Sequence, residues 1–292
     1  MKKLSAFTMF ILFLFVCFTA YGFCEINKEA IEHLQNGHIN WTTGIVQAKG
    51  VGTPLKKSSG NASVSSMKIL SDSKNNARHN MMKTIQNVRI NSVKKAGNYA
   101  TINNSVAKQL EEIIYKAREN EKMRKYMSDG TVEVYLQLNL YGGFAQLFLP
   151  EEIKQIEPIK QVAIGGKKAF SQPSKTSDLK NYTGLVVDAT CISVNPAMAP
   201  RLLDEDGKEV YGTAFASREF AVQKGMSGYS KDFKTAKISS RVGNNPLSVK
   251  GLRTTGPGNC DIVISNADAS ILRSSSEHLA FLKKCNVIIV LD

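Results

Sequence analysis

The stretch from Val132 to Tyr141 alternates apolar and polar side chains without a break. Its apolar members are Val132, Val134, Leu136, Leu138 and Leu140, and its polar members are Glu133, Tyr135, Gln137, Asn139 and Tyr141. Because successive side chains of a strand point to opposite faces of the sheet, this pattern predicts a strand with one face on a core. On the other face, Tyr135, Gln137, Asn139 and Tyr141 are contact groups typical of a partner-binding surface. Packing of that face against a helix or a second domain is the competing interpretation.

The residues before this strand predict a mixture of strands and helices. Alternation over 45–52 indicates a strand of roughly eight residues. Apolar residues at helical spacing predict a helix from Ser71 or Asp72 to about Asn87, and a longer one from about Asn104 to Tyr126. Residues 88–92 are expected to form a further strand, and Pro150 is expected to open a short acidic helix.

The first residues of the chain have the three-part layout of a secretory signal. Lys2 and Lys3 precede an apolar run of about 14 residues, and Ala20-Tyr21-Gly22 supplies small residues at a cleavage site. A transmembrane anchor is the alternative, but crossing a bilayer takes roughly 20 apolar residues. A lipid anchor is disfavoured because bulky Val16 and Phe23 precede Cys17 and Cys24. We therefore expect a signal peptide at 1–22 and delivery to the periplasm or cell envelope.

The second half repeats the mixed pattern after a segment poor in apolar residues. Residues 161–180 are predicted to be a linker, which separates a domain at 23–160 from a domain at 181–292. Strands are expected at 185–189, in a hairpin over 201–211, at 261–264 and at 285–291, with a helix from Asn266 to Lys284. The last strand is wholly apolar, which favours a central position in its sheet. The helix between the last two strands could form a right-handed parallel crossover. The predicted fold class is thus α+β or α/β, with two small domains, each a mixed sheet with packed helices.

The chain carries a formal charge of +13, or +11 without Lys2 and Lys3. An excess of this kind in an exported protein favours contact with anionic cell-wall polymers or lipid headgroups. Scattered, solvated lysines that keep the protein soluble are the competing explanation, since no run of five like charges occurs. No nucleic-acid partner is expected.

The cysteines are too widely separated for a zinc ribbon. In an oxidising compartment, Cys260 and Cys285 are the preferred disulfide pair because each lies beside a predicted strand of one local unit. Burial of both thiols as small apolar groups is the alternative.

The motifs that could carry chemistry are incomplete. The acidic turn at Asp204-Glu205-Asp206-Gly207 has Phe215 where a calcium-binding loop requires a carboxylate. Residues 165–168 and 50–52 lack the frames of phosphate-binding and dinucleotide-binding loops. We expect no catalytic residues, no metal and no cofactor. A hydrolase that uses Asp188 with Asp204 and Asp206 is the enzymatic alternative.

Three segments of the first half carry a family resemblance. They are Thr43-Gly44-Ile45-Val46-Gln47-Ala48-Lys49-Gly50-Val51-Gly52, the helix Asn76-Ala77-Arg78-His79-Asn80-Met81-Met82, and Val88-Arg89-Ile90. Over roughly 40–142 the chain resembles the twenty-kilodalton-lipoprotein-like family of bacterial envelope proteins, whose relatives include FlgP and the N-terminal part of FlgT. This resemblance implies a compact strand–helix–strand domain and a non-enzymatic role in assembly near an outer-membrane complex such as a flagellar basal body. The stretch 196–212 is similar to C-terminal domains of envelope proteins of the same group, which name no activity.

The sequence therefore predicts an exported structural protein that binds other envelope proteins or copies of itself. A carboxylate-based hydrolase and a binder of anionic cell-wall or lipid groups are the alternatives.

Overall fold

The computed structural model describes residues 28–54, 66–153 and 181–292. The predicted signal peptide and linker lie outside these residues, as does Cys24. Within the described residues, no helix combines the length and the hydropathy needed to cross a membrane.

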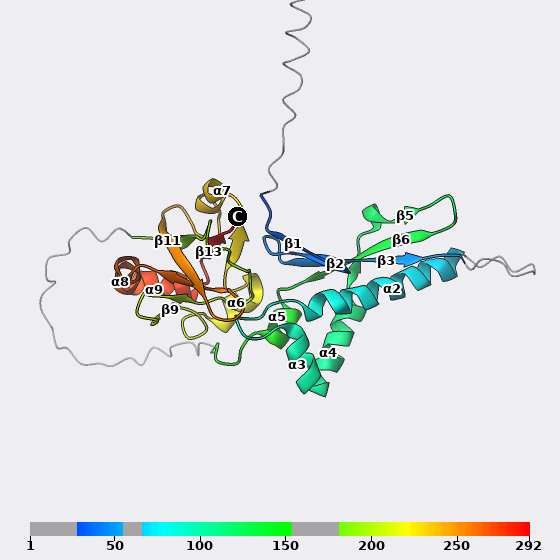
Figure 1. The fold of residues 1–292 in the computed structure, drawn as a ribbon, viewed down its shortest axis with the longest axis horizontal. Coiled ribbons are helices and arrows are strands. Elements are labelled where there is room, and N and C mark those ends of the chain that lie inside the picture. The colour runs from blue at the N-terminus through cyan, green and yellow to red at the C-terminus, as the bar shows by residue number, and fades with distance from the viewer. Residues whose placement is uncertain (1–27, 55–65, 154–180) are drawn as a thin grey trace, which may run out of the picture.

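The first half, residues 28–153, is built on one antiparallel sheet. Its strands follow the order β1-β2-β3-β6-β4, with β5 also paired to β6. The strands are β1 (Ile31–Leu34), β2 (Gly37–Asn40), β3 (Ile45–Gly52), β4 (Arg118–Glu119), β5 (Lys125–Tyr126) and β6 (Val132–Asn139). The helices are α2 (Ser66–Gln86), α3 (Ala96–Ile102), α4 (Asn104–Tyr115), the 3-10 helix η1 (Glu121–Met123) and α5 (Gly143–Phe148). Figure 1 shows α2 running along β3.

Helix α2 covers one face of this sheet because β3 turns small side chains toward it. Gly50 lies so close to α2 that a Cβ there would overlap the Ser73 carbonyl oxygen and would lie 2.6 Å from the Ala77 Cβ. A bulkier residue at this position would push helix and strand apart. The two glycines of this strand, Gly50 and Gly52, thus serve close packing of backbone on backbone.

The second half, residues 181–292, contains a mixed sheet. Its strand order is β10-β13-β7-β11-β12-β8-β9, and β10, β13, β7 and β11 run parallel. The strands are β7 (Gly184–Asp188), β8 (Leu202–Leu203), β9 (Glu209–Tyr211), β10 (Gly228–Ser230), β11 (Pro246–Thr255), β12 (Asp261–Ile264) and β13 (Val287–Val290). The helices are α6 (Arg218–Lys224), α7 (Phe233–Lys237), α8 (Asn266–Arg273) and α9 (Ser276–Lys283).

Both faces of this second sheet are covered near β13. Val287 and Ile289 face the main core together with Phe281 of α9, whereas Ile288 and Val290 pack with Ala236 of α7. Burial on two faces explains why β13 is apolar throughout, and its place between β10 and β7 confirms the predicted central position. The fold class of two small α+β domains is confirmed, although the first sheet is antiparallel and not mixed.

Several predicted elements were wrong in extent or in pairing. The predicted helix 104–126 ends at Tyr115, because Arg118 and Glu119 pair with β6 as an edge strand. The predicted helix 266–284 breaks at Ser274 and Ser275, where the Ser275 side chain caps α9. Residues 88–92 form only an isolated bridge between Arg89 and Lys95, and residues 150–153 form a turn where a helix was expected.

The predicted crossover between the last two strands is also absent. Strands β12 and β13 are separated by β11 and β7, and β12 runs antiparallel to β11 while β13 runs parallel to β7. The two strands therefore run in opposite directions and are not neighbours.

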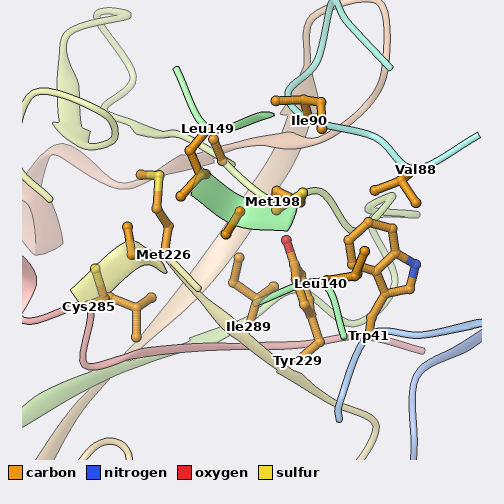
Figure 2. Packing of buried hydrophobic residues seen from close by; sticks show 14 of the residues in the cluster. Trp41, Val88, Ile90, Leu140, Leu149, Met198, Met226, Tyr229, Cys285 and Ile289 are labelled. Carbon is orange, nitrogen blue, oxygen red and sulfur yellow. The ribbon is translucent and has the colours of Figure 1, made fainter. Parts of the chain in front are cut away.

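The described residues of the two halves share one hydrophobic core. Trp41 and Leu140 of the first half lie beside Met198 and Tyr229 of the second (Figure 2). The rings of Trp41 and Tyr229 meet edge to face, with centroids 5.9 Å apart. Backbone hydrogen bonds join the halves as well, since the Met198 and Ala199 amides donate to the carbonyl oxygens of Arg89 and Ile90. We define this contact region as the junction.

Candidate functional site

The face of the first sheet opposite α2 is the candidate interaction surface. Side chains of Lys49, Glu133, Tyr135, Gln137 and Asn139 share this face, and we call it the open face. Among the described helices, the one that packs broadly on this sheet is α2, and it covers the other side. The predicted alternation is confirmed, because Val132, Val134, Leu136 and Leu138 are buried while Asn139 is exposed.

Polar contacts hold the open face in a fixed arrangement. Gln137 Nε2 donates to Gln47 Oε1 across the strands at 2.8 Å. Lys49 forms an ion pair with Glu133, and this hydrogen bond lowers the pKa of the Glu133 carboxyl and raises the pKa of Lys49. A surface whose side chains are already ordered loses less conformational entropy when a partner binds.

Tyr141, predicted to share this face, lies in the junction instead. The chain leaves β6 at Asn139, and Asn139 Oδ1 accepts a hydrogen bond from the Tyr141 amide at 2.8 Å. The Tyr141 ring packs against Gly44 and Gly225, where it would lie 2.5 Å and 2.8 Å from an added Cβ. Burial raises the pKa of Tyr141. Tyr135, Gln137 and Asn139 therefore form a contiguous surface without Tyr141.

Two histidines extend the open face, and sequence reasoning missed them. The strand register places His33 opposite His38, His38 opposite Gln47, and Gln47 opposite Gln137. The two imidazole centroids lie 5.9 Å apart. Burial, and next the nearby charge of His33, lower the pKa of His38. The spacing His-x4-His could have suggested this pair once the hairpin turn at Gln35-Asn36 was recognised.

This histidine pair predicts acid sensitivity of the β1–β2 hairpin. The folded pKa of His38 lies below its unfolded value of about 6.5, so the unfolded chain binds more protons as the pH falls through that range. Stability is therefore complete above about pH 6.5 and decreases below it. Urea unfolding at neutral and at mildly acidic pH should show that His38→Gln loses less stability on acidification than the wild-type protein does. His79→Gln, at an exposed position on α2, should retain the wild-type loss, and an equal loss in all three proteins would contradict the assignment.

In the hydrolase alternative, Asp188 does not come together with the acidic turn that holds Asp204 and Asp206. Asp188 ends β7, where its Oδ1 accepts from the Thr190 hydroxyl at 2.7 Å. Asp204 follows β8, separated from β7 by β11 and β12, and it is buried against Arg273 with Nη1 2.8 Å from Oδ2. The Arg273 guanidinium and the Lys208 and Asp206 amides lower the pKa of Asp204 despite its desolvation. Exposed Asp206 accepts a hydrogen bond from Asn266 at the turn tip. Each carboxylate thus has a local structural role.

The predicted Cys260–Cys285 disulfide is absent, because both residues are free, buried thiols. Cys260 precedes β12 and Cys285 precedes β13, so the two residues lie at opposite ends of antiparallel strands that are three strand positions apart. Three strand spacings amount to about 14 Å, well beyond the roughly 7 Å that a disulfide can span between Cα atoms. Burial raises the pKa of Cys260 to about 11 and also raises that of Cys285, so both thiols are poor nucleophiles. His278 Nδ1 lies 2.8 Å from the Ile271 carbonyl oxygen, within the α8–α9 unit, and no hydrogen bond of the described residues joins His278 to Cys285.

A cleft of about 400 Å³ opens at the junction. The cleft is lined by Lys231, Leu291 and Ser193–Pro196, which follow the carboxyl ends of β10, β13 and β7. This edge of an α/β sheet is where ligands often bind. Arg89 is one of the residues that line the cleft. It forms an ion pair with Glu32, and its Nε donates to the Pro196 carbonyl oxygen at 2.9 Å. This arginine therefore joins the two halves, since Glu32 belongs to the first and Pro196 to the second.

No cluster of three or more His, Cys, Asp or Glu side chains within the described ranges could hold a metal ion.

One protein family matches the second half of the chain. Residues 184–292 match the family described as the second domain of Treponema pallidum Tp0624, and this description names no catalytic activity. The match begins at the first residue of β7. A comparison with curated proteins finds no match. What the comparisons show is that the second half of this chain is similar to the second domain of Treponema pallidum Tp0624.

Proposed function

We propose that this chain is an exported, non-enzymatic protein of the cell envelope that acts in assembly by protein–protein contact through the open face. The observation that carries the proposal is the open face itself. Its polar and aromatic side chains are ordered by cross-strand contacts, and α2 packs on the opposite side of the sheet. Such surfaces suit specific recognition, because tyrosine and amide side chains offer both apolar contact and hydrogen bonds.

Two further observations support a structural role. The candidate carboxylates make local contacts within the fold, and the thiols of Cys260 and Cys285 are buried. The apolar leader at 1–22 favours export to the envelope. Association with a flagellar basal body or another outer-membrane complex is the narrower form of the proposal, and it depends on the family resemblance of residues 40–142.

A pull-down from envelope extract tests the proposal. Gln137→Arg places a charge in the middle of the open face and breaks the amide pair with Gln47. We expect this variant to lose the partners that the wild-type protein retains, or to lose self-association in light scattering. Tyr115→Arg is the matched control, because Tyr115 is 70% exposed on α4, away from this face, and it should behave as wild type. A strictly monomeric wild-type protein without an envelope partner would contradict the assembly role.

A further inference from the structure

Arg241 presents a half-buried positive charge without a counter-ion among the described residues. Its Nε donates to the Val287 carbonyl oxygen at 2.9 Å, and its two Nη atoms donate to the carbonyl oxygens of Lys224 and Gly225 at 2.6 Å each. These three bonds leave two of the five guanidinium N–H groups free for another acceptor. In the part of the chain that the structure describes, no ion pair joins Arg241 to a carboxylate.

Lys224 places a second cation beside the first. Its Nζ donates to the neutral Asn286 Oδ1 at 2.7 Å. Burial, and next the charge of Arg241, lower the pKa of Lys224, and burial likewise lowers the pKa of Arg241. Within the described residues, Lys224 also has no carboxylate partner. The two like charges therefore disfavour each other in a partly desolvated place, and the groups that accept their hydrogen bonds are neutral carbonyl and amide oxygens.

Residues Arg241 and Lys224 both line a cavity of about 320 Å³ at the junction. Its other lining residues include the hydroxyl-bearing Thr42, Tyr141, Ser230, Thr235 and Ser239, and within the described ranges no carboxylate residue lines it. Asp232 is bonded to this lining, since it accepts the Thr235 hydroxyl at 2.6 Å, and it pairs with Lys28 at 3.4 Å. Thr42 and Tyr141 belong to the first half and the remaining hydroxyls to the second, so a ligand here would contact both.

We infer that this cavity binds a phosphate group, held by Arg241 and Lys224, with the hydroxyls of Thr42, Tyr141 and Ser239 as further donors. A guanidinium and an ammonium together suit a doubly charged oxyanion, because charge-assisted hydrogen bonds are stronger than neutral ones. The volume admits a phosphate group with part of a larger molecule attached. The same chemistry is offered by free phosphate, by a phosphorylated small molecule and by the phosphomonoester headgroup of a lipid.

Calorimetric titration of the purified protein with inorganic phosphate at low ionic strength tests this inference. We expect one phosphate per chain. Lys224→Met should weaken binding about ten-fold or more, since it removes one charge-assisted contact. Arg241→Met should remove binding, but Arg241 also holds three backbone carbonyls, so Lys224→Met is the decisive variant for a folded protein. Arg218→Met is the matched control. Arg218 likewise donates to backbone carbonyls, those of Pro150 and Gln146, but it does not line the cavity, and its replacement should leave phosphate binding unchanged.

A second arm separates the sources of the phosphate. Co-sedimentation with vesicles of phosphatidic acid in phosphatidylcholine tests the lipid headgroup, with pure phosphatidylcholine vesicles as the blank. Saturable binding of free phosphate that Lys224→Met weakens supports a soluble ligand. Binding to phosphatidic acid alone, weakened by the same variant, supports a lipid headgroup. Absence of both, or binding that Lys224→Met leaves at the wild-type level, would overturn the inference.

Discussion

Gly50→Ala should destabilise the protein by about 3 kcal/mol or more. The added methyl would overlap the Ser73 carbonyl oxygen and the Ala77 backbone nitrogen of α2. Both are backbone atoms of a long helix, so neither can move aside without lifting α2 from β3. The interior of the first half depends on this contact, because Ala77, Met81 and Ile85 of α2 are fully buried against the sheet.

Urea unfolding followed by far-UV circular dichroism measures this effect. Gly143→Ala is the matched control, because an added Cβ at Gly143 meets no atom within 4 Å. The control should remain within about 0.5 kcal/mol of the wild-type protein. Equal stability of Gly50→Ala and wild type would show that helix and strand are not in the close contact described.

Asp261→Ala should lower the free energy of unfolding by about 2 to 3 kcal/mol, because it removes a carboxylate that accepts several hydrogen bonds at the junction. Asp261 is 1% exposed. Its carboxylate accepts from Arg201 Nη2 at 2.5 Å, from the Arg201 amide at 3.2 Å and from the buried Ser92 hydroxyl at 2.8 Å. Ser92 belongs to the first half and Arg201 to the second. The Arg201 side chain is 42% exposed and can regain water, which keeps the loss below that of a fully buried ion pair.

The fluorescence of Trp41, the single tryptophan, measures the effect of Asp261→Ala at the junction. Trp41 lies in the junction, so its fluorescence reports on the contact between the halves, whereas circular dichroism reports on the whole chain. For the wild-type protein we expect the two signals to change together, since one core spans both halves. In Asp261→Ala both midpoints should fall. Exposed Asp206→Ala removes only one long hydrogen bond, from Asn266 at 3.3 Å, and should change the midpoints little, so a similar fall in that control would assign the effect to charge alone.

Local sequence patterns predicted the elements whose environment is simple. Residues 132–139 alternate because one face of β6 meets α2 and the other does not. Residues 287–290 are wholly apolar because α7 and α9 cover both faces of the sheet. In each case the presence or absence of one packed helix on each face decides the pattern, so period and polarity carry enough information.

The errors arose where distant pairing overrode local preference. Arg118 and Glu119 suit a helix as well as a strand, and their pairing with β6 decides the outcome. The Cys260–Cys285 pairing failed because strand order and direction cannot be read from neighbouring segments. Tyr135, Gln137 and Asn139 lie on the open face, as predicted. Tyr141 does not, because the chain turns into the junction after Asn139. Arg241 and Lys224 are 17 residues apart, and no sequence motif indicates that the two residues lie close together.

Site-specific photo-crosslinking in intact cells tests the assembly role most directly. A photoreactive side chain at position 135 would stand on the open face, and one at position 115 would stand on exposed α4. We expect position 135 to give a discrete crosslinked product with an envelope protein or a second copy of the chain, and position 115 to give none. Equal crosslinking from both positions, or no product from position 135 in cells that contain the protein in their envelope, would contradict it.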